Sequence, residues 1–299
     1  MSAEPLAPRG KRPDNPTLGI AFLVLAAVLI PISDGFAKVL AADLPPVQIV
    51  WLRYFSQTSL ILPIVIWIYG RRVLATRSPI TQIVRSLLIT GAAFCFFSSV
   101  VTIPLADAVA VFFVSPFIVT ALSPLVLGER VGIWRWSAVT AGFIGTLIIV
   151  RPGFEAFEVG MLYALGAGVC FALFVLVTRR LAGGDPPLVT TFITGLGATA
   201  LTAIALPWVW VALTPPMIWP IAIMAVLGCL FSVFVILAYE HAGAAQLAPF
   251  GYVEIAAAAV VGWVLFGQLP DWMTWLGIAI IVSSGLVIAW RERVRRRVN

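Results

Sequence analysis

The sequence predicts an all-α polytopic membrane protein whose ten transmembrane helices form two inverted repeats of five. Three observations predict this fold: an extreme apolar composition, the placement of lysine and arginine, and an internal repeat. Of the 299 residues, 61% are hydrophobic and only 11% are charged, whereas a soluble domain is about half apolar and a quarter charged. This surplus exceeds what one soluble core can hide, so lipid is the expected solvent.

Ten apolar segments approach the length of about 20 residues that a bilayer-spanning helix needs. Short segments rich in proline, glycine or charge separate them. The expected spans are 18–40, 47–69, 80–102, 106–127, 132–150, 159–180, 188–212, 217–239, 244–266 and 272–290. The division between the third and fourth spans depends on Pro104, because 80–127 is otherwise one long apolar run. Two polar tails remain, 1–17 and the basic segment 291–299, with no room for a soluble catalytic domain.

The basic residues favour an even number of spans with both termini in the cytoplasm. If the N-terminus is inside, the inner segments hold most of the lysine and arginine. The outer loops then hold only Arg151, with Lys38 near an outer helix end. Cytoplasmic loops of membrane proteins carry such an excess. The same placement at helix ends accounts for the net charge of +6 without a surface for nucleic acid.

Short sequence matches recur along the chain at an offset of 139 to 141 residues. The matched pairs are Lys38-Val39-Leu40-Ala41 with Arg179-Arg180-Leu181-Ala182, Pro45-Pro46 with Pro186-Pro187, Gly19 with Gly160, and Gly128-Glu129 with Gly267-Gln268. They predict a duplication into residues 18–150 and 159–290. Because five helices is an odd number, the second copy enters the membrane from the opposite side. Inverted repeats of this kind occur in secondary transporters, where the substrate binds near mid-membrane between the halves.

Polar residues inside the spans are the candidate functional residues, because ionisable groups are costly to bury in a membrane. Gln246, Phe250 and Glu254 are spaced i, i+4 and i+8, which places them on one face of a continuous ninth helix. Glu254 lies about 15 Å into that span, near mid-depth, and its repeat partner on the fourth span is Ser115. We expect Glu254 to hold a substrate ammonium group or a proton; the alternative is a structural bond to a neighbouring helix.

Four further polar residues have a functional and a structural interpretation. Asp34 and Lys38 have the i, i+4 spacing of an ion pair, which would gate the outer mouth or merely stabilise the first helix. Arg53 would pair with Asp34 or Asp43, or meet a substrate carboxylate, and the structural role is favoured. His241 is the only histidine. It would couple protons or lie in a solvated loop at the inner end of the eighth span, and the loop is favoured.

Aromatic and proline residues complete the candidate cavity. The aromatic candidates for substrate contact are Phe97, Phe112, Phe234, Phe250 and Trp263, although most aromatic side chains of such a chain face lipid or core. Pro116 and Pro249 interrupt the fourth and ninth spans beside the proposed site. Proline removes a helical hydrogen bond, so we expect these helices to bend there.

Several chemistries are excluded by the sequence. It contains no phosphate-binding loop of the G-x-x-x-x-G-K-S/T type, which argues against an ATP motor. Cys95, Cys170 and Cys229 lack the spacing of metal ligands. A membrane-embedded lipid enzyme would need a clustered catalytic set, and a channel would need a continuous polar pore. We therefore expect no enzyme, no cofactor and no metal, and transport driven by a gradient.

Two stretches of sequence resemble a known family, the EamA-type members of the drug/metabolite transporter (DMT) superfamily. The first runs from Ile103-Pro104-Leu105-Ala106-Asp107-Ala108 through Pro116 to Gly128-Glu129-Arg130, and the second from Tyr252-Val253-Glu254 through Trp263 to Gly267-Gln268. They are similar to the fourth and ninth helices of that family. Two positions depart from its pattern: Ile255 stands where a proline is usual, and Gln268 where a glutamate is usual.

The resemblance implies ten helices around a central cavity and an alternating-access carrier of small metabolites in the cell inner membrane. Bacterial exporters of aromatic and other neutral amino acids look most similar to this chain. We therefore expect amino-acid export, with drugs or sugar derivatives as the alternative cargo. The expected partners are the small-molecule substrate and the lipid bilayer, with no nucleic acid; the oligomeric state stays open, and a monomer is compatible with the family.

Overall fold

The computed structural model describes residues 15–70, 76, 78–128, 131–151, 158–180 and 186–298, and its regular structure there is helical. The helices are α1 (Pro16–Leu40), α2 (Pro46–Tyr69), α3 (Pro79–Thr102), α4 (Leu105–Phe112), α5 (Ser115–Leu127), α6 (Ile133–Val150), α7 (Val159–Arg180), α8 (Pro187–Ala203), α9 (Leu206–Val209), α10 (Pro215–His241), α11 (Ala244–Gly251), α12 (Val253–Phe266) and α13 (Trp272–Val298). Seven of them have proline in the first turn, where its missing N–H costs nothing: α1, α2, α3, α5, α8, α9 and α10.

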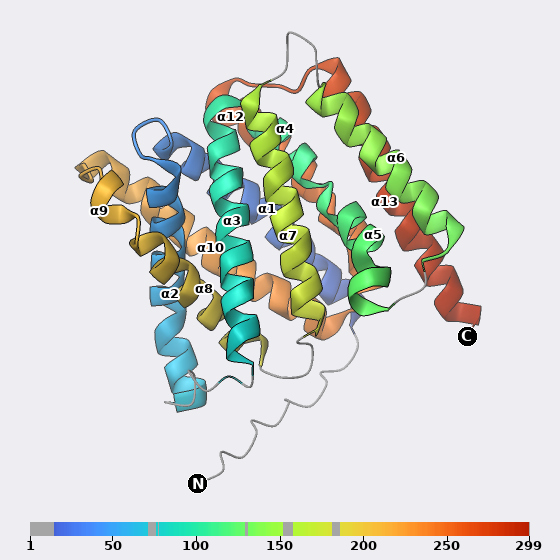
Figure 1. The fold of residues 1–299 in the computed structure, drawn as a ribbon, viewed down its shortest axis with the longest axis horizontal. Coiled ribbons are helices and arrows are strands. Elements are labelled where there is room, and N and C mark those ends of the chain that lie inside the picture. The colour runs from blue at the N-terminus through green and yellow to red at the C-terminus, as the bar shows by residue number, and fades with distance from the viewer. Residues whose placement is uncertain are drawn as a thin grey trace.

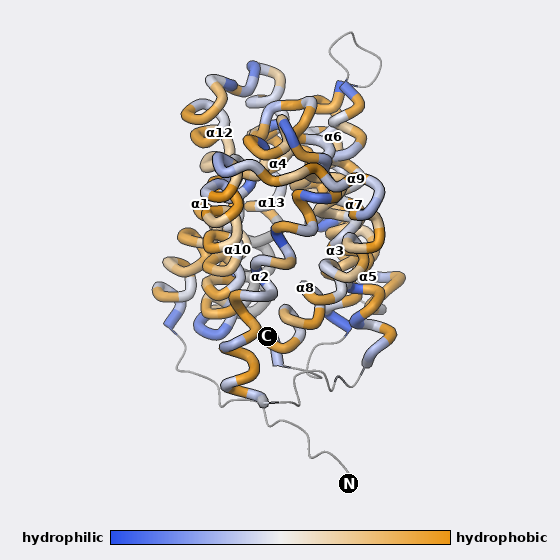
Figure 2. Tube along the Cα trace, turned by 90° about the vertical axis from the view of Figure 1, so that its left-hand side faces the viewer, coloured by the Kyte–Doolittle hydropathy of each residue, from blue (hydrophilic) through white to orange (hydrophobic). Residues whose placement is uncertain are grey.

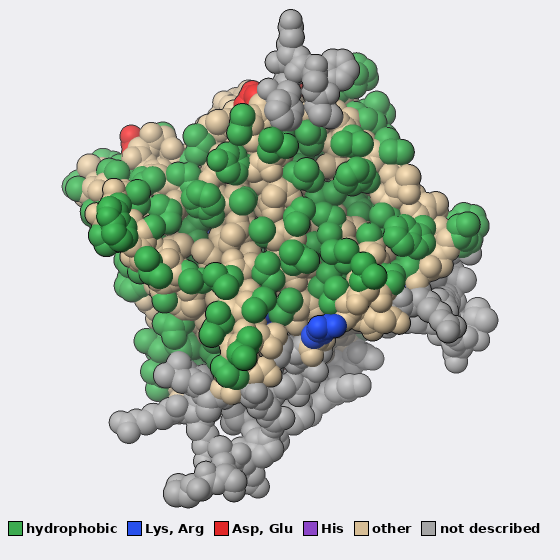
Figure 3. Space-filling model, in the orientation of Figure 1, with side chains coloured by type: hydrophobic (Ala, Val, Ile, Leu, Met, Phe, Trp, Pro, Cys, Tyr) green, Lys and Arg blue, Asp and Glu red, His purple; other side chains and the backbone are tan. Residues whose placement is uncertain are grey.

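The helices occupy all ten of the expected span positions, which confirms an all-helical polytopic membrane protein. Within the described residues, eight helical segments are long and apolar enough to cross a membrane. The remaining two, Pro187–Ala203 and Trp272–Val287, are apolar but shorter. Figure 2 shows hydrophobic residues along the middle of the helices and most hydrophilic ones toward their ends. The face seen in Figure 3 is covered largely by hydrophobic side chains, as a lipid-facing surface requires.

Two boundaries differ from the sequence prediction. The helix expected over 188–212 ends at Ala203, because Pro207, in the first turn of the short α9, has no N–H to bond the Ala203 carbonyl four residues earlier. The amide of Gln48 then satisfies the non-helical backbone: Nε2 donates to the Val211 carbonyl at 2.8 Å, and Oε1 accepts from the Val211 N–H at 2.9 Å. At the other end of the chain, α13 continues to Val298, through the segment expected as a tail.

The spans expected over 106–127 and 244–266 are each broken into two helices. The first break lies at Phe113 and Val114, just before Pro116, which has no N–H to bond the carbonyl four residues earlier. The second lies at Tyr252, three residues after Pro249 and next to a glycine of low helix propensity. The two breaks occupy equivalent positions in the two sequence repeats.

Contacts between helices recur in both halves of the chain. α1 packs most extensively against α10, and its repeat counterpart α7 packs against α3, the counterpart of α10. α6 and α13 run side by side, which Figure 1 shows at its right-hand edge. Gly128 and Gly267, matched in the sequence repeat, both end their helices in the left-handed conformation, with φ of 69° and 66°.

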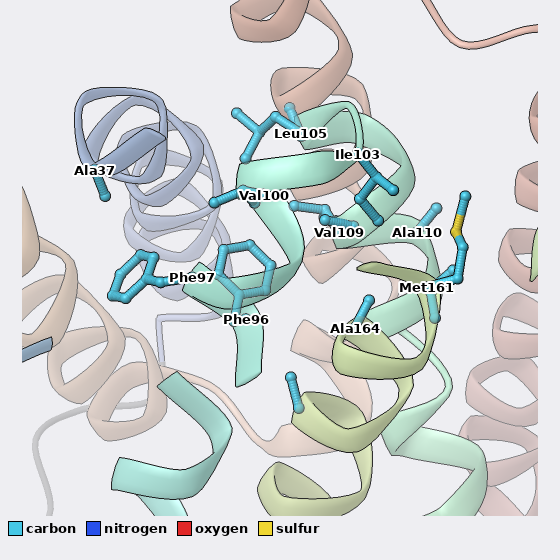
Figure 4. Packing of buried hydrophobic residues seen from close by; sticks show 14 of the residues in the cluster. Ala37, Phe96, Phe97, Val100, Ile103, Leu105, Val109, Ala110, Met161 and Ala164 are labelled. Atoms are coloured by element: carbon cyan, nitrogen blue, oxygen red, sulfur yellow. The ribbon is translucent and has the colours of Figure 1, made fainter. Parts of the chain in front are cut away.

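A hydrophobic cluster fills one end of the bundle, where α1 and α3 end and α2, α4 and α7 begin. It includes Leu40, Ile49, Val100, Ile103 and Leu105, all at most 2% exposed. Figure 4 shows Val100, Leu105 and Val109 packed together above Phe96 and Phe97 of α3. These buried side chains pack the ends of the surrounding helices together.

Candidate functional site

A cavity of about 270 Å³ lies directly below the hydrophobic cluster, near the middle of the helices. Its volume is just below the range of about 300–1,000 Å³ that is usual for small-molecule sites. Helices from both halves of the chain line it. The lining residues are Ile30, Asp34, Arg53, Tyr54, Ile89, Ala92, Ala93, Phe96, Phe97, Phe112, Phe113, Ser115, Pro116, Phe171, Phe231 and Glu254. The wall is therefore mostly apolar and aromatic, with a few polar groups converging on it.

The cation of this cavity is held in place by two partners. Arg53 Nη1 of α2 donates to Asp34 Oδ1 of α1 at 2.5 Å, and both side chains are nearly buried. The guanidinium also lies over the Phe97 ring, 5.3 Å from its centre. Asp34 thus pairs with Arg53 across two helices, which was one expected alternative. The ion pair expected within α1, between Asp34 and Lys38, does not form.

The second carboxylate of the cavity comes from the other half of the chain. Glu254 lies in the first turn of α12, where the helix N-terminus favours negative charge. Among the described residues it has no hydrogen-bond partner, although it lies close enough to Arg53 and Asp34 to interact with their charges. Ser115 begins α5 at the equivalent position of the first repeat, and its hydroxyl likewise has no partner among these residues.

The two helix breaks meet beside the cavity. The rings of Phe113 and Tyr252, one from each break, lie 5.4 Å apart at their centres. The Tyr252 ring in turn covers Gly285 of α13, where any side chain would collide with it. The breaks let Ser115 and Glu254 reach the cavity from the ends of half-helices, an arrangement that places polar groups at mid-membrane in transporters.

Aromatic rings form most of the remaining wall. Phe96 lies 5.9 Å from Phe112, and Phe112 lies 5.0 Å from Phe171. The candidates Phe97 and Phe112 line the cavity, as do Phe96, Phe113 and Phe231, which the sequence places on the same expected spans as Phe97, Phe112 and Phe234. Sequence reasoning missed two aromatic lining residues, Tyr54 and Phe171. At the repeat offset of 141, Phe171 corresponds to Ile30, and both residues line the cavity. The repeat therefore relates these two positions.

Comparison with known proteins identifies the family. The sequence model of the EamA-like transporter family matches residues 17–151 and again residues 158–290. The chain belongs to the EamA-like transporter family. This confirms the family resemblance and makes the protein a multi-pass membrane transporter rather than an enzyme. It does not bear out the narrower resemblance to amino-acid exporters, because the relatives of this EamA-like chain carry different cargoes.

Three bacterial relatives illustrate that range. The S-adenosylmethionine uptake transporter of Rickettsia prowazekii is 27% identical over 279 residues, covering 92% of this chain and 93% of its own. The riboflavin transporter of Vibrio cholerae is 29% identical over 285 residues, covering 94% and 93%. The pseudopaline exporter of Pseudomonas aeruginosa is 27% identical over 284 residues, covering 91% and 95%. Uptake and export both occur among these EamA-like relatives.

A solved structure, described only as "Crystal structure of protein", has the same fold. It superimposes with a TM-score of 0.66, covers 93% of this chain and 98% of its own, and is 19% identical in sequence. At that identity the similarity concerns the fold alone.

Seven predicted site residues of this EamA-like chain do not line the cavity: Lys38 and Pro249, and the five that are described next. Gln246 caps its own helix, with its Oε1 accepting from the Gly243 N–H at 3.3 Å. Phe234 stacks on Phe22 of α1 rather than facing the cavity, and Trp263 is 58% exposed on the outer surface of α12. Phe250 lies on α11, before the break, and does not line the cavity.

His241 is the fifth, and its surroundings correct the expectation of a solvated loop. It is buried at the end of α10, with 8% of the residue exposed. Its Nδ1–H donates to the Leu237 carbonyl at 2.8 Å, and its ring packs against Phe22. The residue completes the last turn of α10 and does not line the cavity.

Lys38 closes the bundle at the end filled by the hydrophobic cluster. Its Nζ donates to the Ile103 carbonyl at 2.6 Å and to Gln268 Oε1 at 3.1 Å, and it lies over the Phe266 ring. It thus links α1 to the α3–α4 and α12–α13 connections. Nearby Asp107 is buried, and its Oδ1 accepts no hydrogen bond within the described structure.

Within the described residues, Asp107 Oδ1 lacks a partner because the N-cap residue of α4 is a proline. Asp107 is the third residue of α4, as Gln246 is of α11. Gln246 caps the N–H of Gly243, but the matching cap residue of α4 is Pro104, which has no N–H to donate.

An ion pair outside the spans ties the two repeats together at the same end. Arg151 Nη2 donates to both carboxylate oxygens of Asp271 at 2.5 Å, and the Thr274 N–H donates to Asp271 Oδ1 at 2.8 Å. Burial works against ionisation, but the hydrogen bonds from Arg151 and Thr274 outweigh it and lower the pKa of Asp271 below its usual range. The pair joins the end of α6 to the start of α13.

Proposed function

We propose that this chain is a secondary transporter that moves small metabolites, amino acids first among them, across the bacterial inner membrane by alternating access. The observation that carries the proposal is the cavity itself. It lies at mid-depth between the two halves, and it combines an aromatic wall with Arg53, Asp34 and Glu254. Buried ionisable groups of this kind in a membrane are costly and mark substrate or ion pathways.

The proposed topology has ten spans in two inverted five-helix repeats, 18–150 and 159–290, with both termini in the cytoplasm. The double match of the family model and the recurring helix contacts support the repeat. In this topology α8 and the apolar part of α13 also cross. α8 has 17 residues, about 25 Å of helix, and a short span of this kind is accommodated by local thinning of the bilayer.

The proposed cycle starts from a state that is closed toward the outside. In the proposed orientation, the hydrophobic cluster and Lys38 lie between the cavity and the outer surface. Outward opening would separate these contacts while a seal forms on the cytoplasmic side. We propose net export, and the relatives named above include both an exporter and uptake transporters.

S-adenosylmethionine is the second candidate cargo, favoured by one specific observation. The R. prowazekii uptake transporter aligns over more than nine-tenths of both chains. S-adenosylmethionine is an amino acid that carries a planar ring and a positive sulfonium group. Both features suit an aromatic wall with an unpaired carboxylate.

Purified protein in liposomes tests the proposed function. Uptake of radiolabelled L-phenylalanine, S-adenosylmethionine and riboflavin would be measured with and without a pH gradient. We expect transport of the first two, and loss of transport in Ala93→Phe, which fills the cavity from α3. The matched control is Ala279→Phe on the exposed face of α13, which should transport normally. Equal transport by both variants would remove the cavity from the pathway.

A further inference from the structure

We infer that Arg53 and Glu254 form a two-point clamp for the carboxylate and ammonium groups of an α-amino-acid head group. The inference rests on the proposed function, because it assumes that the transported molecule enters this cavity. It goes further by assigning each end of the head group to a residue. It also defines the substrate class: free amino acids and their derivatives with an intact head group.

Arg53 has the unused hydrogen-bonding capacity that a carboxylate needs. A guanidinium has five N–H donors, and within the described structure Arg53 uses one of them, to Asp34. Asp34 and the Phe97 ring fix the plane of the group. A guanidinium held in this way binds a carboxylate through two parallel hydrogen bonds without losing much side-chain freedom. The Asp34 pair therefore orients Arg53 rather than neutralising its binding capacity.

Glu254 is the complementary anchor for an ammonium group. It faces the cavity, and its carboxylate accepts no hydrogen bond from any described residue. A carboxylate without a partner at mid-membrane carries a large desolvation cost, which an incoming cation offsets. Ser115, from the equivalent position of the other repeat, adds a hydroxyl oxygen that can accept from the same ammonium group.

The balance of charge also favours a molecule with both signs on its head group. Asp34 already satisfies part of Arg53, so a bare anion would compete with Asp34 and leave Glu254 unpaired. A bare cation would satisfy Glu254 but leave the free N–H groups of Arg53 unused. A zwitterionic head group satisfies both residues at once, while the rings of Phe112 and Phe171 receive the side chain.

Binding to the purified wild-type protein tests the clamp independently of transport. Thermal stability in detergent would be recorded with L-phenylalanine, with 2-phenylethylamine, which lacks the carboxylate, and with 3-phenylpropionate, which lacks the ammonium group. S-adenosylmethionine and riboflavin complete the series, and a ligand that binds the folded state raises the melting temperature. We expect stabilisation by phenylalanine and S-adenosylmethionine at concentrations at least tenfold lower than for either truncated analogue, and none by riboflavin.

Two variants assign the ends of the head group. Arg53→Lys removes the paired geometry and should weaken phenylalanine binding about tenfold or more, with little effect on 2-phenylethylamine. Glu254→Gln should weaken phenylalanine to the same degree and leave 3-phenylpropionate unchanged. Arg179→Lys and Asp43→Asn make the same chemical changes at exposed positions and should bind like the wild type.

The outcomes separate the clamp from the transport proposal. Equal binding of phenylalanine and its truncated analogues, or binding of riboflavin in their place, overturns the clamp even if the protein transports. Selective binding without transport of any compound supports the clamp and contradicts the carrier function. If Arg53→Lys fails to fold, the analogue series on the wild type and the Glu254→Gln variant still decide between these outcomes.

Discussion

Gly166 and Gly168 of α7 have different neighbours and should respond in opposite ways to substitution by alanine. A Cβ added at Gly168 would lie 2.7 Å from Val114 Cγ1 and 3.0 Å from the Phe112 carbonyl oxygen. Val114 lies in the break between α4 and α5, and Phe112 is the last residue of α4 before it. A Cβ added at Gly166 would meet only Cys95, with Sγ at 3.6 Å, which is an ordinary contact. Alanine should therefore be accommodated at one position and not at the other.

The size of the difference follows from two opposing terms. Replacing glycine by alanine inside a helix gains about 0.8–1 kcal/mol in both variants. Overpacking against a backbone carbonyl that cannot rotate away costs about 1–3 kcal/mol, and only at Gly168. Gly166→Ala should therefore stabilise the protein by up to about 1 kcal/mol. Gly168→Ala should be less stable than Gly166→Ala by about 1–3 kcal/mol, since the helix term cancels between them.

Unfolding in mixed micelles with increasing SDS would measure both variants against the wild type. Because the Phe112 carbonyl has to move, Gly168→Ala should also weaken substrate binding, whereas Gly166→Ala should not. Equal stability of the two alanine variants would show that α7 does not approach the helix break as closely as described, and the reasoning would fail.

Three further predictions concern the polar contacts. Gln48→Leu removes both hydrogen bonds to the Val211 backbone and should lower the free energy of unfolding in SDS by about 2–4 kcal/mol. Gln57→Leu breaks a single hydrogen bond to a side chain and should cost less. Equal losses in the two variants would show that Gln48 does not stabilise the non-helical segment. Lys38→Met should open the sealed end, so a cysteine at Val100 in a cysteine-free background should react faster with an impermeant maleimide than it does with Lys38 present. Asp271, whose pKa is lowered in the folded state, contributes stability above its unfolded pKa of about 3.9. The contribution is lost as pH falls through the folded pKa. The wild type should therefore exceed Asp271→Asn in free energy of unfolding by at most about 1 kcal/mol for so exposed a pair, and this difference should shrink below about pH 4. A difference that grows in acid would contradict a lowered pKa.

The positions of the helices could be predicted because proline, glycine and charge mark their ends in the sequence. Pro16, Pro46 and Pro79 each stand in the first turn of a helix, and Gly128 and Gly267 each follow a last turn. The early end of α8 was missed. Apolar residues continue past Pro207, and hydropathy does not distinguish a helix from an apolar connection that Gln48 satisfies.

The candidate site could be predicted only where the depth of a residue in the membrane and the internal repeat were enough to locate it. They place Ser115 and Glu254 at the cavity, because both residues follow equivalent helix breaks. The i, i+4, i+8 argument failed for Gln246 and Phe250, since it assumes a continuous helix and α11 ends before Tyr252. The break interrupts the regular helix between Phe250 and Glu254, so spacing along the sequence alone does not place these residues on one face.

Which residues pair between different helices could not be predicted from the sequence for a similar reason. Spacing within α1 shows that Asp34 can reach Lys38, but it contains no information about a residue on another helix. Arg53 approaches Asp34 because α1 and α2 both border the cavity, and Lys38 is drawn instead to the Ile103 carbonyl. Such choices depend on tertiary packing, which local spacing does not encode.

Protection of a cavity cysteine by substrate tests the central claim most directly. Cys95, Cys170 and Cys229 would be replaced by alanine, and Ser115→Cys introduced at the cavity, with Ser98→Cys on α3, outside the cavity lining, as the control. The rate of alkylation would be measured with and without saturating L-phenylalanine or S-adenosylmethionine. The account predicts that substrate slows labelling at position 115 severalfold and leaves position 98 unchanged. Unchanged labelling at position 115 with a substrate that the same protein transports would place the binding site elsewhere.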